Sequence, residues 1–262
     1  MADLSITALY TCQTWQWGGF SCADLLATRD SKRVFDITNA ALAVARRFNP
    51  KLPLLRESLV HRHAMIDHIV KSSPHARVVE LAAGLSRRGA AFTEDPAVHY
   101  TEIDLVASKK RDILARSDRG RSVLARPNLT IVDGDIETAS FPAADIVIAE
   151  GLLMYLDAEA QRRLFAKVRA LGQVRFVFDL VPTPEQPAPG RAGRVLESVM
   201  KRFTGGRGFT RDTRTRGDIL AELRTAGFGN ARALTPVEIP GLPHPEWRTQ
   251  TVVFSASPAI PS

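Results

Sequence analysis

Residues 77–105 read RVVELAAGLSRRGAAFTEDPAVHYTEIDL, and this stretch decides the fold. Its first apolar run, 77–81, leads into a small-residue turn that contains Gly84, and a helix-like stretch then connects to a second apolar run that ends at Asp104. Strand, tight turn, helix and an acid-tipped strand in this order are typical of the first half of a nucleotide-binding α/β domain. Because the turn has no G-x-G-x-x-G pattern, a dinucleotide phosphate site is not indicated.

The same alternation continues along the chain. Runs such as FVFDLV are nearly continuous and apolar, which is typical of parallel strands covered by helices on both faces. The pattern therefore predicts an α/β fold with a doubly wound sheet. The expected strands are 77–81, 98–103, 129–133, 145–150, 175–181, 232–239 and 249–255, and the expected helices between them are 86–93, 106–116, 158–171 and 216–226.

Helices are also expected before the first strand. Apolar residues recur at helical spacing at Val34, Ile37, Ala41, Val44 and Phe48, which predicts a helix there, and a second helix is expected close behind it, over 54–71. We expect a domain organisation in which these helices form a cap on a cofactor-binding core. The boundaries are 1–72 for the N-terminal cap and 73–262 for the core, with an insertion at 182–216 that includes a basic helix over 194–203 and contributes to the substrate pocket.

The amino-acid composition limits the binding partners and the cellular compartment that can be expected. The net charge is +7, but the arginines are scattered and no basic run is interleaved with aromatic residues, so no nucleic-acid partner is expected. No apolar run is long enough to cross a bilayer and the start lacks a secretory pattern, so a cytoplasmic protein without a membrane partner is expected. Cys12 and Cys22 are the only cysteines and are interpreted as small buried thiols, with no metal site.

Several motifs resemble those of one family. The segment IVIAEGLLMYL, 146–156, closely resembles the EG-x-x-x-YL signature of the leucine carboxyl methyltransferase superfamily, and YTEIDL, 100–105, followed by Lys109 resembles its Y-x-E-x-D segment. VVELAAGLSRRG, PNLTIVDGDIE and HRHAMID resemble its first motif, its adenine-binding acidic motif and its R-x-x-x-x-D helix. The TALYT-x-x-x-W start is similar to bacterial members tied to polyketide-type secondary metabolism. The resemblance implies a class I S-adenosylmethionine (SAM) methyltransferase fold, Rossmann-like and seven-stranded, with SAM as cofactor.

The resemblance also implies cofactor contacts. Arg62 would pair with the methionine carboxylate of SAM, because a planar guanidinium suits a carboxylate. Asp104 would accept from the ribose diol and Asp135 from the adenine amino group, and Glu102 and Asp133 are the nearest alternatives for these two roles. The full set of cofactor-binding candidates is Arg62, Glu80, Ala82, Gly84, Asp104, Leu105, Asp135, Ile136, Glu150 and Gly151.

Two of these candidates leave alternatives open. Glu80 would lie near the amino group of SAM or make a structural bond. Ala82 departs from the family pattern, in which glycine is common, so the alternatives there are a tolerated methyl group and a shifted loop. Tyr155 is the catalytic candidate, placed to cover the methyl-transfer centre, and a packed ring is its alternative reading.

The expected reaction is O-methyl transfer to a small molecule. A carboxylate acceptor is already ionised at neutral pH and needs no general base, so a carboxylic acid is the expected acceptor. A hydroxyl acceptor would need a base, and His63 or His244 is then the candidate. A SAM-binding protein that transfers no methyl group, such as a cyclase scaffold or a ligand-responsive protein, is the alternative from another functional class. The sequence leaves the oligomeric state open.

Substrate contacts are expected from the cap and the insertion. Aromatic residues gather near the N-terminus, where they are interpreted as an apolar or stacking wall, with hydrophobic packing as the alternative. The wall candidates are Tyr10, Trp15 and Trp17, and the candidate partners for a substrate carboxylate are Arg202, Arg207 and Arg211.

Overall fold

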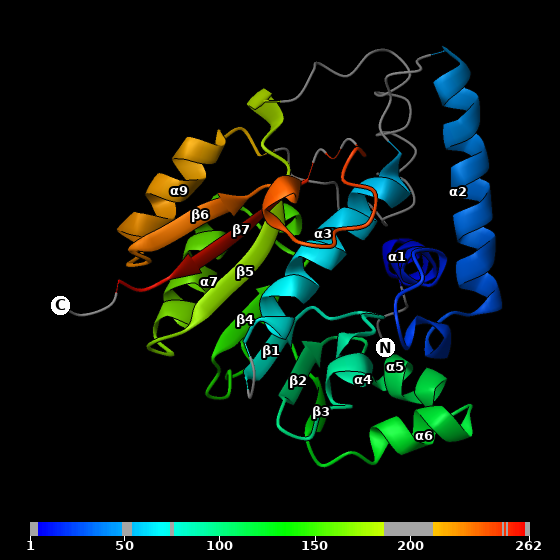
Figure 1. Cartoon of the computed structure of the whole chain (residues 1–262). Coiled ribbons are helices and arrows are strands. Elements are labelled where there is room, and N and C mark those ends of the chain that lie inside the picture. The colour runs from blue at the N-terminus through cyan, green and yellow to red at the C-terminus, as the bar shows by residue number, and fades with distance from the viewer. Residues whose placement is uncertain are drawn as a thin grey trace.

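The computed structural model describes residues 5–48, 54–73, 76–185, 212–247, 249 and 251–259. A seven-stranded sheet with the order β3-β2-β1-β4-β5-β7-β6 forms its centre (Figure 1). The first five strands pair in parallel, and β7 pairs antiparallel with both β5 and β6. The strands are β1 (Arg77–Leu81), β2 (His99–Asp104), β3 (Leu129–Asp133), β4 (Ile146–Ala149), β5 (Arg175–Leu180), β6 (Asn230–Leu234) and β7 (Val252–Ser257). The predicted α/β doubly wound fold is confirmed.

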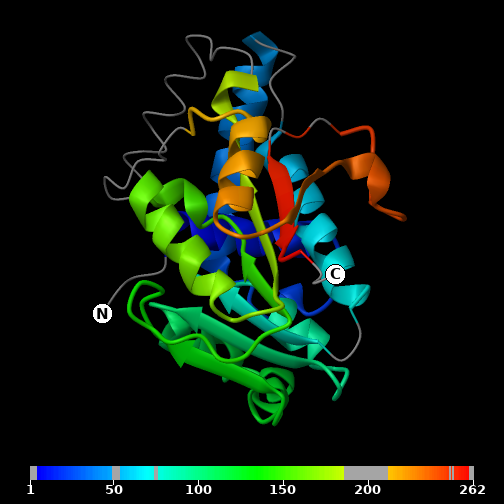
Figure 2. The same ribbon diagram turned by 90° about the vertical axis from the view of Figure 1, so that its left-hand side faces the viewer.

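Helices cover both faces of the sheet, which explains the continuous apolar runs. On one face Val79 and Phe176 pack against Phe165 of α7 (Ala158–Arg169) and Ile219 of α9 (Arg216–Thr225). On the other face, strand residues such as Val78, Ile148 and Val177 pack against α3 (Leu55–Lys71). Figure 2 shows α7 and α3 on opposite sides of the strands. Alternate residues of the central strands β1, β4, β5 and β7 therefore enter two separate hydrophobic cores.

Helices precede the sheet, as the sequence predicts, and the described residues contain three of them. Besides α3, these are α1 (Ile6–Trp17), which Ser5 caps by accepting from the Ala8 amide, and α2 (Arg29–Phe48). Residues of α1 and α2 share a third hydrophobic cluster with Leu59 of α3. The apolar stripe that predicts α2 is not its buried face. Phe35 and Leu42 are buried, whereas the side chains of Ile37, Val44 and Phe48 are 71%, 58% and 83% exposed.

Some strands end earlier in the structure than the sequence predicts. β4 ends at Ala149, so Glu150 lies in the following turn, and β6 ends at Leu234 because Pro236 begins a 3-10 helix. The remaining helices are the short α4 (Arg88–Phe92), α5 (Ala107–Leu114) and α6 (Asp118–Leu124), of which α6 was not predicted. The predicted helix 194–203 lies outside the described residues. Within the part of the chain that the structure describes, no helix combines the length and apolar character needed to cross a membrane.

Candidate functional site

The turn after β1 lies against the tip of β2. Ala82 and Gly84 both adopt left-handed backbone conformations, each with φ of +51°. The Gly84 amide donates to Asp104 Oδ2 at 2.7 Å, and the Val106 amide donates to Asp104 Oδ1 at 2.8 Å. A Cβ on Gly84 would lie 3.7 Å from the Cβ of Ala8, so α1 passes directly over this turn. The Asp104 carboxylate therefore fixes the turn, and each of its oxygens keeps a second lone pair for another donor.

Glu102, the alternative to Asp104 as the ribose acceptor, is already engaged in a buried ion pair. Its carboxylate is buried and forms an ion pair with Lys110, 2.6 Å from Oε2 to Nζ, and the same Lys110 ammonium donates to the Ser86 carbonyl. Burial raises the pKa of Glu102 to about 7, against the effect of Lys110. Leu105, which follows Asp104, is 54% exposed. The tip of β2 thus presents Asp104 and Leu105, and not Glu102, to a ligand.

The end of β3 presents Asp135 in a similar way. Asp135 is exposed, and its Oδ1 accepts from the Glu137 amide at 2.9 Å. The alternative, Asp133, forms an ion pair with Arg111 and accepts from the Ser108 amide at 2.8 Å. Ile136 is partly buried against the main hydrophobic core. Asp135 therefore has more of its hydrogen-bonding capacity open to a ligand than Asp133.

Glu150, Gly151 and Arg62 meet at the end of β4. Arg62, on α3, donates from Nε to Glu150 Oε1 at 2.7 Å and from Nη1 to Asp179 Oδ2 at 3.0 Å. Gly151 has a φ of +65°, and a Cβ there would lie 3.5 Å from both Nη atoms of Arg62. The left-handed turn and the absence of a side chain thus bring backbone close to the guanidinium. Asp179 closes the arrangement by accepting from the Gly151 amide at 2.5 Å.

His63 connects this group to α1. Its Nδ1 lies 2.9 Å from Glu150 Oε2, and Arg87 Nε donates to its Nε2 at 3.1 Å. These partners assign the proton to Nδ1, because only Nε2 then has a lone pair for Arg87. The ring stacks on Trp15 with centroids 3.9 Å apart. Burial, and then the positive charge of Arg88, hold the pKa of His63 well below its usual value, so the imidazole is neutral.

Glu80 makes structural bonds on both of its oxygens. Arg88 Nη1 donates to Oε1 at 2.8 Å, and the Tyr100 hydroxyl donates to Oε2 at 2.9 Å. Arg88 also donates from Nη1 to Glu150 Oε2 at 2.5 Å and from Nε to Asp67 Oδ1 at 2.7 Å. Burial alone would raise the pKa of Glu150, but Arg88, His63 and Arg62 together hold it well below its usual value. Of the two expected roles for Glu80, the structural bond is the observed one.

Tyr155 lies in the 3-10 turn after Gly151, close to the same charges. Burial raises the pKa of its phenol, and a hydrogen bond with Thr7 of α1 and the charge of Arg62 oppose that rise. The phenol therefore keeps its proton at neutral pH. Tyr155 is placed between the β4 turn and α1, at the carboxyl edge where ligands bind in open α/β sheets.

The aromatic candidates of α1 separate into buried and exposed residues. Tyr10 is buried, stacks on Phe35 and donates to Asn39 Oδ1 at 3.3 Å, and Trp15 is buried against His63. Trp17 is 40% exposed and stacks on Trp247, with centroids 5.9 Å apart. Only Trp17 of the three presents substantial ring surface. Arg202, Arg207 and Arg211 lie outside the described residues.

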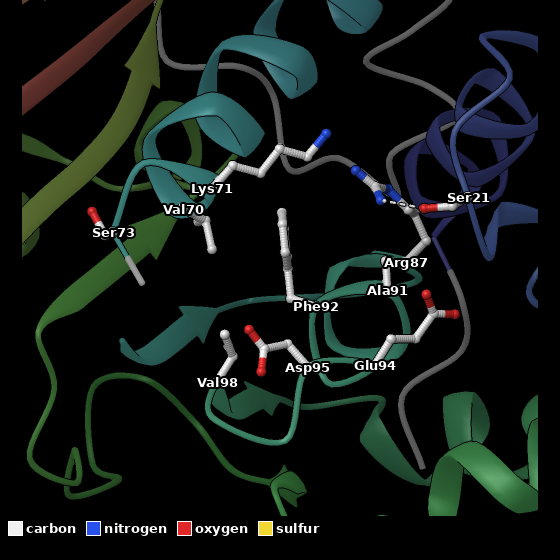
Figure 3. A pocket seen from close by; sticks show the side chains of 10 residues that line it. All are labelled: Ser21, Val70, Lys71, Ser73, Arg87, Ala91, Phe92, Glu94, Asp95 and Val98. Atoms are coloured by element: carbon white, nitrogen blue, oxygen red, sulfur yellow. Dashed lines mark hydrogen bonds between the residues drawn. The ribbon is translucent and has the colours of Figure 1, made fainter. Parts of the chain in front are cut away.

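A separate cavity of about 340 Å³ lies elsewhere (Figure 3). Its walls include Lys71 at the end of α3, Phe92 of α4 and Val98, which immediately precedes β2. These residues stand at the amino ends of β1 and β2, whereas Gly84, Asp104 and Gly151 stand at the carboxyl ends. The cavity is therefore distinct from the candidate cofactor site.

Sequence reasoning did not single out Asp179, Arg87 or Arg88, although all three join the buried charges. A signal existed for Asp179, since it is the one acid in the otherwise apolar run FVFDLV. His63, considered as a general base, has both ring nitrogens occupied, and this excludes the role in the present arrangement. Among the described residues, no three His, Cys, Asp or Glu side chains are grouped so as to hold a metal ion.

Comparison with known proteins agrees with this architecture. A relative from Mycobacterium sp. (strain KMS), provisionally named an S-adenosyl-L-methionine-dependent methyltransferase, is 30% identical over 176 residues, which cover 56% of this chain and 58% of the relative. The chain thus spans little more than half the length of that relative.

Solved structures share the fold. The 1,6-didemethyltoxoflavin N1-methyltransferase of Burkholderia thailandensis has a TM-score of 0.52 at 18% identity, covering 86% of this chain and 90% of that one. Magnesium protoporphyrin IX methyltransferase of Synechocystis PCC 6803 has a TM-score of 0.53 at 15% identity, covering 80% and 89%. Both were solved with S-adenosylhomocysteine (SAH) bound. The family profile of leucine carboxyl methyltransferase matches residues 21–169, which is more than half of the chain. The chain belongs to the leucine carboxyl methyltransferase family.

Proposed function

We propose that the chain is a SAM-dependent O-methyltransferase that forms a methyl ester on a small carboxylic acid. Family membership and the fold support methyl transfer from SAM, and the two solved neighbours bind the demethylated product, SAH. The polyketide-type secondary metabolism suggested by the N-terminal segment is part of this proposal. So is the division into a cap, 1–72, and a core, 73–262.

The proposed cofactor orientation follows the carboxyl edge of the sheet. Asp104 accepts from the ribose hydroxyls with its free lone pairs, and Asp135 accepts from the adenine amino group beside Ile136 and Leu105. The methionine end lies over Gly84 and Gly151, where the backbone leaves space and Arg62 offers its remaining N–H groups to the carboxylate. Tyr155 covers the methyl-transfer centre from the turn after β4.

The proposal of a carboxylate acceptor over a hydroxyl acceptor rests on the hydrogen bonds and protonation of His63. A phenol or alcohol must lose a proton as the methyl group arrives, which requires a base with a free lone pair. His63 lies beside the site, but its one lone pair already accepts from Arg87, its other ring nitrogen donates to Glu150, and burial lowers its pKa, which makes it a weak base. His244, the other candidate base, is exposed and pairs with Glu246. A carboxylate needs no such base, and the enzyme then has only to align it with the S–CH₃ bond and exclude water.

Substrate contacts are proposed for the cap and the insertion. Trp17, stacked on Trp247, offers an exposed aromatic surface at the end of α1. Tyr10 and Trp15 are packed in the hydrophobic cluster that α1 shares with α2 and α3, so they would shape the site from within the cap. Arg202, Arg207 and Arg211 are proposed as partners for the acceptor carboxylate on the strength of their charge.

The experiment uses SAM labelled with tritium in the methyl group. The protein is incubated with this SAM and a panel of carboxylic acids, with phenols of matched size in parallel, and each product is then treated with mild base. A methyl ester releases volatile labelled methanol under these conditions, whereas a methyl ether does not. We expect volatile label from carboxylic acids only.

The controls separate the alternatives. Stable label on phenols would support the hydroxyl O-methyltransferase reading, and a rate that rises with pH as the phenol ionises would identify that chemistry. SAM binding without label transfer to any acceptor would favour the non-methylating alternative. The Asp104→Ala variant serves as a background measurement, because the proposed ribose contact is lost in it.

A further inference from the structure

Seven buried charged groups converge beneath the proposed methionine end of the cofactor. Arg62 and Asp67 come from α3, and the others come from β1, the α4 segment, the β4 turn and β5. The members are Arg62, Asp67, Glu80, Arg87, Arg88, Glu150 and Asp179, and none of their side chains is more than 7% exposed. We refer to these seven residues as the charge cluster.

The charge cluster contains more negative than positive groups. Three guanidinium groups face four carboxylates, and the adjoining His63 is neutral. Burial lowers the pKa of Arg87 to about 10, which leaves it charged at neutral pH. The neighbouring Glu102 and Lys110 balance one another as a pair. With all carboxylates ionised, the cluster therefore carries one negative charge in excess, in a site where water screens it poorly.

Asp179 is the carboxylate in which this excess is concentrated. It is fully buried on β5, and the one cationic partner that it has among the described residues, Arg62, is shared with Glu150. Burial raises its pKa, and the nearby Glu150 adds to that rise against the effect of Arg62. By contrast, Glu150 contacts two guanidinium groups and His63. Asp179 also holds the Gly151 amide, so it positions both sides of the proposed methionine site.

We propose that the charge cluster selects the positively charged cofactor SAM over its uncharged-sulfur product SAH, with Asp179 as the residue that supplies the selecting charge and positions Arg62 and Gly151. SAM carries a sulfonium, an ammonium and a carboxylate, for a net charge of +1, whereas SAH has lost the sulfonium charge. Apart from the methyl group that is lost with this charge, the two molecules are the same, and sinefungin controls for the charge separately from that methyl group. The difference in their affinity therefore reports the electrostatic potential of the site, and a negative site favours SAM and promotes release of the product.

This inference rests on the cofactor orientation proposed above. Arg62 cannot provide the discrimination itself, because its partner on either molecule is the same carboxylate. Asp179→Asn removes the charge but keeps the size of the side chain and an oxygen that can accept from the Gly151 amide. Its NH2 group can no longer accept from Arg62 Nη1, which weakens the contact with the methionine carboxylate for SAM and SAH alike. The ratio of the two affinities, and not either affinity alone, therefore reports the charge of Asp179.

The test is calorimetric titration of the full chain with SAM, SAH and sinefungin, in which a carbon-bound amine replaces the sulfonium methyl and restores a positive charge. For the wild type we expect SAM and sinefungin to bind at least several-fold more tightly than SAH. In Asp179→Asn we expect the SAM-to-SAH affinity ratio to fall about tenfold, with SAH affinity the less affected. Asp145→Asn is the matched control, because Asp145 pairs with Arg77 at the amino ends of β1 and β4 and should leave the ratio unchanged.

Each other outcome is informative. If Asp179→Asn weakens SAM and SAH equally, Asp179 has a structural role only and the charge selection is wrong. If the variant does not fold, the wild-type order decides, and SAH binding as tightly as SAM and sinefungin would overturn the inference. A wild type that binds none of the three ligands contradicts the proposed function itself, which is a distinguishable result.

Discussion

The Gly84 amide donates to Asp104 Oδ2 across a separation of 20 residues, at 2.7 Å. The same carboxylate accepts from the Val106 amide at 2.8 Å, so the residue proposed to bind the ribose also sets the shape of the turn beneath the methionine group. Cofactor contact and loop geometry thus depend on one side chain.

Asp104→Ala is expected to weaken SAM binding by about 10- to 100-fold, because hydrogen bonds to a charged acceptor contribute roughly 1.5–3 kcal/mol each. Asp104→Asn should lose less, since its amide oxygen still accepts from one backbone N–H. Titration calorimetry measures both. Asp36→Ala, which removes an exposed carboxylate paired with Lys32 on α2, is the control and should bind as the wild type does. Equal binding by wild type and Asp104→Ala would refute the ribose assignment.

Ala82→Gly is expected to stabilise the fold by about 0.5–1 kcal/mol. Ala82 has a φ of +51°, where an L-residue with a Cβ pays roughly 1–2 kcal/mol and glycine does not, and the greater entropy of unfolded glycine offsets part of the gain. Urea denaturation gives the free energy of unfolding. The buried neighbour Ala83 has no positive φ, so Ala83→Gly should destabilise the protein. A loss of stability in both variants would show that the Ala82 methyl packs favourably.

Gly120→Ala is expected to destabilise the protein by more than about 2 kcal/mol. A Cβ on Gly120, in the first turn of α6, would lie 1.9 Å from the Leu114 carbonyl oxygen, which belongs to backbone and cannot move aside cheaply. Gly217 occupies the first turn of α9, and a Cβ there would meet only Thr215 Oγ1, at 3.5 Å. Gly217→Ala should therefore be neutral or slightly stabilising. Thermal unfolding of the two variants tests the contrast, and similar melting temperatures would contradict it.

Glu102→Gln is expected to change how stability depends on pH. The pKa of Glu102 is raised from 4.5 to about 7 in the folded protein, chiefly by burial. Between these values the folded state holds a proton that the unfolded state has released, so this group's contribution to stability falls as pH rises from about 4.5 to 7. The glutamine variant should lack that fall, and its stability relative to wild type should rise by on the order of 1–3 kcal/mol over this range.

Urea denaturation at several pH values measures this difference. Glu159→Gln is the control, because Glu159 is exposed and pairs with Arg163 on the surface of α7. A constant offset between wild type and Glu102→Gln across the range would mean that Lys110 keeps Glu102 ionised throughout.

Tyr155→Phe is expected to lower kcat by about tenfold and leave the Kd for SAM nearly unchanged. Burial raises the pKa of the phenol, so it keeps its proton at neutral pH, and we propose that it covers the transfer centre as a hydrogen-bond donor and not as a base. Single-turnover rates with saturating SAM separate chemistry from binding. A fall in SAM affinity without a change in rate would assign Tyr155 to cofactor binding instead.

Much of the sheet could be predicted because its central strands are covered on both faces and read as continuous apolar runs. Strand 77–81 matches the prediction to the residue, as does the edge strand 129–133, although three of its five residues are exposed, and the acid at the tip of β2 is where the alternation places it. Local pattern was a weaker guide to exposure on α2. Ile37, Val44 and Phe48 of the predicted apolar stripe face solvent, whereas Leu42 is buried and Phe35 packs on Tyr10 of α1. Periodicity indicates that a helix forms, but contacts with other elements decide which face is buried.

The charge cluster was the least predictable part of the site. Arg62 and Asp179 are 117 residues apart, and Arg62 and Glu150 are 88 apart, so no local window contains the pair. The lowered pKa of His63, and with it the neutral state, likewise depends first on burial and then on Arg88, which comes from another helix. A motif can nominate Arg62 and Glu150 separately, but it does not indicate that they bind one another.

The long separations within the charge cluster also constrain the order in which the chain folds. Closing a long loop costs chain entropy before its contacts form, so the ion pairs between α3 and the ends of β4 and β5 are expected late in folding. Until α3 docks, Glu150 and Asp179 lack Arg62 and would face water at the ends of β4 and β5, and the apolar residues beside them cannot be fully desolvated. The docking of α3 is therefore expected to exclude the last water from the core and to assemble the cofactor site in the same late step.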